Sequence, residues 1–370
     1  MNFLKKMEKN KIKKFYYKYG KNIFRGVLTG IDNLAVFGFN KNAKRAPLFV
    51  AWNVTYKCNS RCSYCTAWKL GLDKTKKELN TEEAIKVIRQ LGKMKTWVLS
   101  FTGGEPLLRE DIFVLIKEAK KQGLTTNINT NGFFLEKFAE QIIKSQVDTI
   151  TVSVESHDAK IHDELRNCKN SFMKLQEGIK KLKELKKKYN SKKPVIMIRA
   201  NVSKKNYKEL GRYFDFWVDK VDDIMLQPIH EGSAESFLHI QKKGIQFEEK
   251  DKKEYKEYMN KLFKKYSGID SEYYREFYSF FFNTRQMAKK YRCFAAYFMM
   301  QIDPYGNVYP CAELHSKLGN LKETPLKNIL NNQKIKEFRK LLKNRKNKCF
   351  CWYNCTGPIN LPLSKLLKWI

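Results

Sequence analysis

Three cysteines lie close together early in the chain, in the segment Cys58-Asn-Ser-Arg-Cys62-Ser-Tyr-Cys65. Thiolates presented from such a short spacing hold the irons of a [4Fe–4S] cluster. Three ligands would leave one iron open to a small molecule, and an open position is typical of a catalytic metal site. A zinc site, a disulfide pair and unrelated thiols are the alternatives. Zinc would need a fourth ligand, and no nearby Cys or His completes such a set.

The pattern Cys-x3-Cys-x2-Cys, with an aromatic residue before the last cysteine, resembles the signature of the radical SAM enzymes. The resemblance implies that Cys58, Cys62 and Cys65 hold a [4Fe–4S] cluster whose open iron binds S-adenosylmethionine (SAM). It also implies reductive cleavage of SAM to a 5′-deoxyadenosyl radical, which abstracts hydrogen from a substrate. The cofactor carries this chemistry, and the protein supplies position and excludes water.

The elements that must position this segment alternate along the chain. Strand patterns cover residues 48–55, 97–101, 125–129, 149–154, 195–201 and 224–227. Helical patterns cover residues 81–93, 111–122, 135–145, 172–188 and 206–219. Such alternation predicts βα units and an α/β fold, here a partial (β/α)6 TIM-like barrel as the radical SAM core. Ligands should collect at the carboxyl ends of its strands, where the cysteine segment begins.

Polar and glycine-rich motifs follow the next strands, and the resemblance assigns them to SAM. The Gly-Gly-Glu-Pro stretch after the second strand would bond the SAM amino group, and glycines allow close backbone approach. A Ser/Glu pair after the fourth strand would contact ribose and methionine, although the family more often has Asp at the second position. The arginine beyond it would contact the SAM carboxylate or form a salt bridge. The predicted contacts are Gly103, Gly104, Glu105, Pro106, Asn131, Ser153, Glu155 and Arg166. No catalytic residue is assigned.

Two further strand ends are less specific. Asn201 ends the fifth strand and could approach the ribose, and Leu226, Gln227 and Pro228 end the sixth near the expected adenine edge. Ordinary strand-end chemistry is the alternative for both.

A second group of cysteines, at Cys293, Cys311, Cys349, Cys351 and Cys355, lies towards the other end of the chain. A β-hairpin is predicted around residues 298–309 and a helix over 327–343. The spacing Cys-x12-Gly-x4-Cys resembles the start of the SPASM extension of radical SAM enzymes. That extension usually has seven cysteines and two auxiliary clusters, so five imply one auxiliary [4Fe–4S] cluster. The resemblance assigns Cys293, Cys311 and Cys355, with Cys349 or Cys351 as fourth ligand. Zinc is the alternative, because four thiolates also suit it.

The chain thus divides into four predicted regions: a basic amphipathic N-terminal segment (1–46), the radical SAM core (47–232), a helical, aromatic-rich bridge (233–290), and a small SPASM-like Cys-rich domain with an apolar tail (291–370). The aromatic run at 273–282 could fill a core between domains or line an apolar substrate pocket.

The net charge of +35 allows three interpretations: solvated lysine-rich faces, an anionic membrane surface or nucleic acid. No nucleic-acid-binding motif is recognisable, so nucleic acid is not an expected partner.

Residues 1–46 carry 12 Lys/Arg against Glu8 and Asp32, and apolar segments lie at 23–39 and 361–370. These termini could touch a membrane or pack on the enzyme. The nine cysteines suit reduced, metal-binding thiols, and the sequence shows neither a membrane span nor a secretory signal. We therefore expect a cytoplasmic protein that could also make peripheral contact with the inner membrane surface.

The sequence therefore predicts a radical SAM enzyme, an oxidoreductase or transferase, acting on an unidentified peptide, protein or small metabolite. Modification of a lipid or isoprenoid at the membrane surface is an alternative. A non-catalytic iron–sulfur electron-transfer or scaffold protein is an alternative of another class. An enzyme of this kind would also need an external electron donor such as ferredoxin or flavodoxin.

Overall fold

The computed structural model describes residues 23–39, 41–73, 75–230, 244–266, 271–314, 316–345 and 351–367. Among them, nine strands form one sheet in the order β6-β5-β4-β3-β2-β1-β7-β8-β9. Strands β1 to β6 pair in parallel with their neighbours in the chain. They span Phe49–Thr55, Val98–Gly103, Thr125–Thr130, Thr149–Ser153, Val195–Val202 and Asp223–Pro228.

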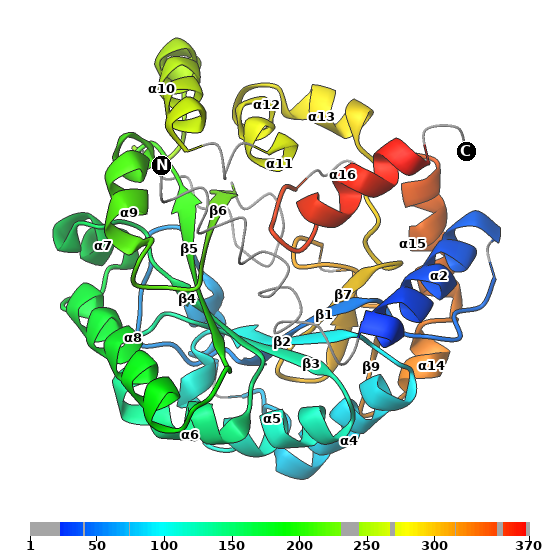
Figure 1. Ribbon diagram of the computed structural model, residues 1–370. Coiled ribbons are helices and arrows are strands. Elements are labelled where there is room, and N and C mark those ends of the chain that lie inside the picture. Colours follow the sequence, from blue (N-terminus) through cyan, green and yellow to red (C-terminus); the bar gives the residue numbers. More distant parts are fainter. Residues whose placement is uncertain are drawn as a thin grey trace.

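These six strands curve around a central space, and helices cover their outer face (Figure 1). The partial (β/α)6 barrel predicted from the sequence is confirmed. The covering helices are α4 (Thr81–Lys93), α5 (Ile112–Lys121), α6 (Leu135–Ser145), α7 (Ala159–Arg166), α8 (Ser171–Lys188) and α9 (Leu210–Trp217). The expected helix over 206–219 is a 3-10 turn, Tyr207–Glu209, followed by α9. Helix α7 was not predicted, because it has only eight residues and most of them are charged or polar.

Side chains on the two faces of the barrel sheet differ sharply. On the outer face, the alternate residues Trp52, Phe101, Ile128, Ile150 and Ile198 are fully buried against the helices. The inner face carries amides, hydroxyls and one arginine beside apolar residues such as Phe49, Val98 and Met197, and these side chains line a cavity. A parallel sheet buried on both faces normally has apolar side chains on both. The polar inner face therefore marks a ligand cavity rather than a second layer of core.

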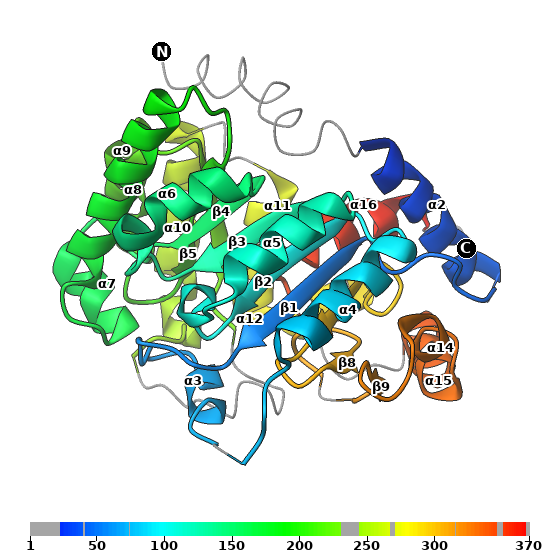
Figure 2. The same cartoon turned by 90° about the horizontal axis from the view of Figure 1, so that it is seen from below.

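The carboxyl-terminal region extends the barrel sheet beyond β1. Strand β7 (Met299–Ile302) pairs in parallel with β1, and β8 (Asn307–Tyr309) and β9 (Gly319–Asn320) follow in antiparallel pairs. The β7–β8 turn is the predicted hairpin, in which Asp303 accepts hydrogen bonds from the backbone N–H groups of Tyr305 and Asn307. Figure 2 shows α14 (Leu326–Ile329) and α15 (Gln333–Lys343) beside β9.

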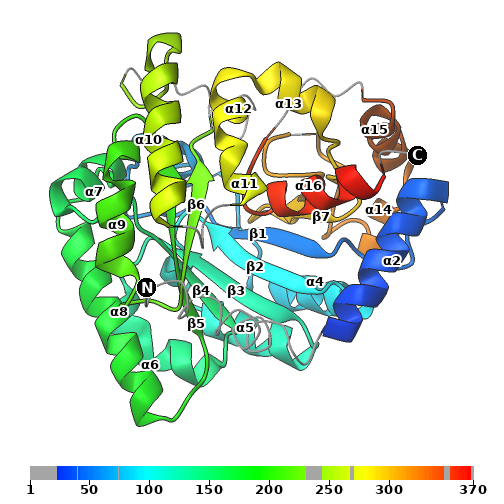
Figure 3. The ribbon, with the colours of Figure 1, turned by 45° about the horizontal axis from the view of Figure 1, so that its top comes forward.

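The bridge contains α10 (Lys252–Lys265), α11 (Glu272–Arg275), α12 (Phe277–Phe282) and α13 (Thr284–Lys290). Its aromatic side chains pack into the main core, where Phe277 is completely buried. No residue of α11 or α12 is among the described residues that line the cavity. The structure thus supports the core interpretation of this run. The last helix, α16 (Gly357–Leu366), packs beside α11 (Figure 3).

Helix α2 (Ile23–Phe39) coincides with the apolar segment expected near the start of the chain. The basic helical pattern before it falls on residues 1–22, outside the described part of the chain. Within the described ranges, we find no helix with the length and apolar character needed to cross a membrane.

Candidate active site and second cysteine group

The cysteine segment forms a loop that leaves the carboxyl end of β1, and Cys58, Cys62 and Cys65 all line the cavity. The glycine pair after β2 fixes the start of this loop. Gly104 donates its N–H to the carbonyl of Thr55 at 2.8 Å, and Glu105 donates to that of Lys57 at 2.8 Å. A Cβ on residue 104 would lie 2.2 Å from the Lys57 carbonyl oxygen, so a larger residue would displace the loop. The glycines therefore position the cysteines, besides any contact with SAM.

Glu105 and Asn131 connect the same loop to the end of β3 through hydrogen bonds. The buried Glu105 carboxylate accepts hydrogen bonds from Thr130 Oγ1 (2.8 Å) and the Asn131 N–H (2.7 Å). Asn131 Nδ2 in turn donates to Asn59 Oδ1, between the first two cysteines, at 2.7 Å. Burial raises the pKa of Glu105, and the donors around it oppose that shift. Asn131 also lines the cavity, whereas Glu105 does not.

A buried trio of Tyr64, Glu155 and Arg166 supports the last two cysteines. Tyr64 Oη donates to Glu155 Oε1 at 2.5 Å, and Arg166 donates to Tyr64 Oη (2.9 Å) and Glu155 Oε1 (3.3 Å). Glu155 is 1% exposed and also accepts the Asn201 N–H at 2.9 Å. Burial lowers the pKa of Arg166, but Cys62, Tyr64 and Glu155 raise it well above its ordinary value. The guanidinium is therefore a permanent cation beside the cysteines.

The cysteine triad has the chemistry needed for an iron–sulfur cluster. Burial raises the thiol pKa of all three residues, to about 11 for Cys58. Arg166 opposes the shift at each cysteine, so it stabilises the anionic form that binds iron. Arg166 and Ser153 line the cavity, whereas Glu155 and Pro106 lie outside its lining. The SAM contacts inferred for these residues remain predictions.

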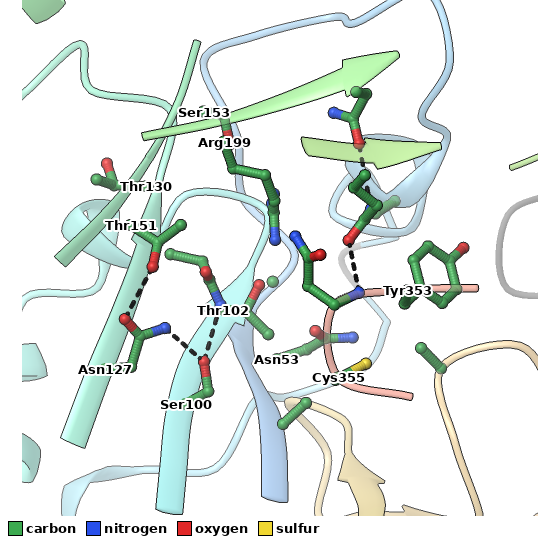
Figure 4. A pocket seen from close by; sticks show the side chains of 18 of the residues that line it. Asn53, Ser100, Thr102, Asn127, Thr130, Thr151, Ser153, Arg199, Tyr353 and Cys355 are labelled. Atoms are coloured by element: carbon green, nitrogen blue, oxygen red, sulfur yellow. Dashed lines mark hydrogen bonds between the residues drawn. The ribbon is translucent and has the colours of Figure 1, made fainter. Parts of the chain in front are cut away.

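The cavity continues from the cysteines down the inner face of the barrel and has a volume of about 520 Å³. Its wall includes a network in which Thr151 Oγ1 donates to Asn127 Oδ1 (3.0 Å) and Asn127 Nδ2 donates to Ser100 Oγ (2.9 Å) (Figure 4). Asn129 Nδ2 also donates to Ser100 Oγ, at 2.8 Å. Arg199 projects from β5 into the same space (Figure 4). The interior can thus orient a polar, charged ligand.

The second group of cysteines gathers at the other side of the cavity. Cys293 follows α13, Cys311 follows β8, and Cys351 and Cys355 precede α16. Burial raises the thiol pKa of Cys351, and the nearby Cys293 and Cys311 raise it further. Cys355 also lines the cavity (Figure 4), and Arg199 opposes the rise of its pKa. Cys351 thus lies near Cys293 and Cys311, and Cys349 lies outside the described residues. The four-cysteine ligand set remains a prediction.

His230 joins the barrel to the loop that carries Cys351 and Cys355. Its Nδ1 donates to the Pro228 carbonyl at 2.9 Å, and its Nε2 accepts the Trp352 N–H at 2.9 Å. Its ring stacks on Tyr353 with 3.6 Å between centroids. Burial lowers the pKa of His230 to about 3, so the ring is neutral and makes a structural joint.

A chain of hydrogen bonds connects the two cysteine groups along the cavity wall. The Asn354 N–H, next to Cys355, donates to Gln227 Oε1 at 3.3 Å. Gln227 Nε2 donates to Asn201 Oδ1 at 3.1 Å, and Asn201 Nδ2 donates to Glu155 Oε1 at 3.2 Å. Glu155 then bonds Tyr64, the neighbour of Cys65. Asn201 and Gln227, placed near the site from their strand ends, are the middle of this chain.

Sequence reasoning missed Arg199 and Asn354. The sequence does single out Arg199, because it is the one charged residue in the mostly apolar strand Val195–Val202. A charge inside such a strand has to face a cavity or a partner. Nothing in the sequence singles out Asn354, because its hydrogen bond to Gln227 depends on how the last cysteine loop packs against β6.

The sheet, the cysteine loop and the second cysteine group together define a partial barrel whose cavity is lined by cysteines from both groups. A model of the radical SAM superfamily matches residues 52–216, and a model of the SPASM iron–sulfur cluster-binding domain matches residues 293–356. The chain belongs to the radical SAM superfamily and carries a SPASM domain, so its cofactors are iron–sulfur clusters and SAM. When bound, the cluster and SAM would supply the radical chemistry of the family, with Cys58, Cys62 and Cys65 as the predicted cluster ligands.

Relatives with established names refine this picture. The chain is 27% identical over 337 residues to an AdoMet-dependent heme synthase of Methanosarcina barkeri, covering 84% of this chain and 91% of that protein. It is 32% identical over 136 residues to an AdoMet-dependent heme synthase of Oleidesulfovibrio alaskensis, covering 36% of this chain and 35% of that protein.

Solved structures share the fold. Streptococcus suis SuiB bound to the precursor peptide SuiA superposes with a TM-score of 0.60 at 20% identity, over 79% of this chain and 66% of SuiB. The chain thus spans about two thirds of SuiB. The protein anSMEcpe with bound AdoMet and the Cp18Cys peptide gives a TM-score of 0.57 at 17% identity, over 80% of this chain and 84% of that one.

Proposed function

We propose that this radical SAM enzyme abstracts hydrogen from a small metabolite that carries a carboxylate or similar anion, bound inside the barrel. The observation that carries the proposal is Arg199. Its Nε is buried without a hydrogen-bond partner, and no salt bridge within the described part of the chain involves it. Arg199 as a whole is half-buried and lines the cavity. A ligand that fills the cavity displaces the water around the guanidinium, and an unpaired cation that loses its water is costly, by several kcal/mol. An anionic substrate group at this position would supply the partner.

The wall opposite Arg199 favours the same kind of ligand. Ser100 Oγ accepts hydrogen bonds from both Asn127 and Asn129. A hydroxyl has two lone pairs and one hydrogen, so two accepted bonds leave its hydrogen to be donated. A ligand here therefore meets a hydroxyl donor as well as a guanidinium, and both favour carboxylate or carbonyl oxygens.

A carboxylated tetrapyrrole is the first substrate class to test. Haem and its precursors carry carboxylate side chains, and the Methanosarcina barkeri relative, matched along most of its length, is named a heme synthase. The peptide-bound neighbours SuiB and anSMEcpe share only the fold at this level of identity. Arg199 and the hydroxyl and amide groups of the barrel wall support an anionic small metabolite over a lipid or a neutral peptide.

The test uses the full chain, reconstituted with iron and sulfide without oxygen and reduced chemically. One measures 5′-deoxyadenosine release with carboxylated tetrapyrroles, smaller carboxylic acids, peptides and lipid extract. We expect stimulation by one of the carboxylates. Arg199→Gln should raise its half-saturating concentration about 10- to 150-fold, the loss of one hydrogen bond to a charged group. Arg89→Gln, at an exposed ion pair with Glu118, is the control and should change nothing.

Three outcomes would overturn the proposal. If only peptides or lipids stimulated the release of 5′-deoxyadenosine, the substrate would not be an anionic small metabolite. Loss of iron from the second cysteine group in Arg199→Gln would show that Arg199 serves that group instead, since it lies close enough to shift the pKa of Cys355. A protein with verified clusters that releases no 5′-deoxyadenosine under any condition would favour the electron-transfer or scaffold alternative.

A further inference from the structure

The first half of helix α2 exposes apolar side chains and buries polar ones, whereas Val36 and Phe37 near its end are buried in the core. Phe24, Val27 and Ile31 repeat at helical spacing on the outer face and are 74%, 53% and 57% exposed. The face turned to the protein carries Thr29 and Asn33, which are 0% and 2% exposed. A helix that packs on a globular core normally shows the reverse arrangement. Contiguous exposed apolar surface marks an interaction site more often than an isolated exposed side chain does.

The buried face holds α2 in this orientation through specific polar bonds. Arg25 donates to the carbonyls of Gly92, Gln122 and Gly123 at 2.8 to 3.0 Å, at the ends of α4 and α5. Thr29 Oγ1 donates to the carbonyl of Lys95 at 2.7 Å. The helix is therefore fixed against rotation that would turn its apolar face inward.

Two further contacts lock the same face. Asn33 Oδ1 accepts the N–H of Leu48 at 3.1 Å, just before β1. Gly26 packs so closely on Trp97 that a Cβ would lie 2.5 Å from the indole ring. The tight approach needs glycine at that position. The contacts of the buried face thus hold Phe24, Val27 and Ile31 towards the outside.

Charged residues that precede and follow α2 in the sequence indicate which kind of partner would bind its apolar face. The 22 residues that precede α2 carry eight lysines against the single Glu8. Lys41 and Lys44, just after the helix, are exposed. The only acidic residue of α2, Asp32, is half-buried and accepts the N–H of Arg45 at 3.0 Å. An apolar helix face flanked by lysines is the pattern of a helix that lies in the interface of an anionic membrane.

We propose that α2 is a membrane-docking helix that lies along an anionic bilayer surface with Phe24, Val27 and Ile31 among the acyl chains. The last turn of α16 lies on the same side of the molecule (Figures 1 and 3), and its Leu366 is 66% exposed. The surface is peripheral to the barrel cavity, so the proposal concerns where the enzyme works and is independent of its substrate.

The test is flotation of the full-length, cluster-loaded protein with phosphatidylcholine vesicles that contain or lack phosphatidylglycerol. We expect binding to the anionic vesicles, weakened by salt. The double variant Phe24→Ser/Ile31→Ser should lower the partition coefficient about tenfold or more, since two apolar side chains leave the acyl region. Val114→Ser/Met173→Ser removes apolar side chains that are also exposed, on α5 and α8, and should bind like the wild type.

A fluorescence measurement tests the depth of insertion separately. The emission that Phe24→Trp adds to that of the six native tryptophans should shift to the blue on anionic vesicles and be quenched by brominated acyl chains, whereas the wild-type emission should change little. The proposal fails if the wild type does not float, or if both double variants float equally well. It also fails if the apolar face is covered within the protein. That result would appear as a dimer that Phe24→Ser/Ile31→Ser dissociates, or as a protein that floats only after residues 1–22 are deleted.

Discussion

Replacing Glu155 by glutamine is expected to destabilise the protein through Arg166, without changing the size of the side chain. Glu155 is 1% exposed and Arg166 is 8% exposed, so the pair is shielded from water. The substitution keeps an oxygen for the Tyr64 hydroxyl or the Asn201 N–H but removes the negative charge. Arg166 then remains buried with no carboxylate partner, 3.3 Å from a neutral amide.

The expected loss follows from what buried pairs are worth when one partner is removed. Breaking such a pair costs about 3–5 kcal/mol, because the remaining charge is buried without compensation. Part of the hydrogen bonding survives in the glutamine, which places the estimate near the lower end, at about 3 kcal/mol. An exposed pair is worth about 0–1 kcal/mol, so Glu118→Gln, which breaks the pair with the mostly exposed Arg89, is the matched control.

The assay is urea unfolding of the iron-free, reduced protein, so that thiolates bound to iron do not compensate Arg166. We expect the midpoint to fall in Glu155→Gln with little change of slope, and to stay nearly constant in Glu118→Gln. Glu155→Asp keeps the charge on a shorter side chain and should lose less than Glu155→Gln. Equal midpoints for Glu155→Gln and Glu118→Gln would refute the reasoning and show that Arg166 does not depend on this carboxylate.

Three further predictions concern how the two cysteine groups are held. Gly104→Ala should reduce iron loading and 5′-deoxyadenosine formation severalfold, because its Cβ would lie 2.2 Å from the Lys57 carbonyl; full loading in an iron assay would contradict this. Gln227→Leu should lower the free energy of unfolding by about 1–3 kcal/mol, since the Asn354 N–H and Asn201 lose a buried partner, and an unchanged urea midpoint would exclude that role. Removing iron with a chelator should lower the melting temperature, because iron binds a site that only the folded chain assembles; calorimetry before and after chelation would detect it.

Much of the barrel could be predicted because its signals are local. Helix α4 begins after Asn80, which accepts the Glu83 N–H while the Glu83 side chain accepts the Asn80 N–H. That capping box is visible in the sequence as Asn followed three residues later by Glu. The apolar run that became α2 was equally clear. Its orientation was not, because the polar bonds of Arg25 and Asn33 join residues far apart in the chain.

The site residues show the same limit. The cysteine spacing predicted the loop, and the glycine pair was expected beside it. The sequence could not reveal that Gly104 packs on the loop backbone, because that contact depends on the parallel pairing of β1 with β2. Likewise the sequence could not reveal that Glu155 accepts hydrogen bonds from Tyr64, Arg166 and Asn201, and its contact with SAM remains a prediction. Long-range contacts decide which polar residues face the ligand and which support those that do.

The two cysteine groups are best understood as parts of one cavity wall rather than as separate modules. Strand β7, which leads towards Cys311, pairs along β1, which leads into Cys58, so both cysteines depend on the same strand pairing. On the opposite side, Gln227 and Asn201 carry hydrogen bonds from the second group to Glu155 beside the first. A displacement of either group must therefore strain the other across the cavity. A substrate that binds between them, as proposed, would be held against both at a fixed geometry, which is what selective hydrogen abstraction requires of a protein scaffold.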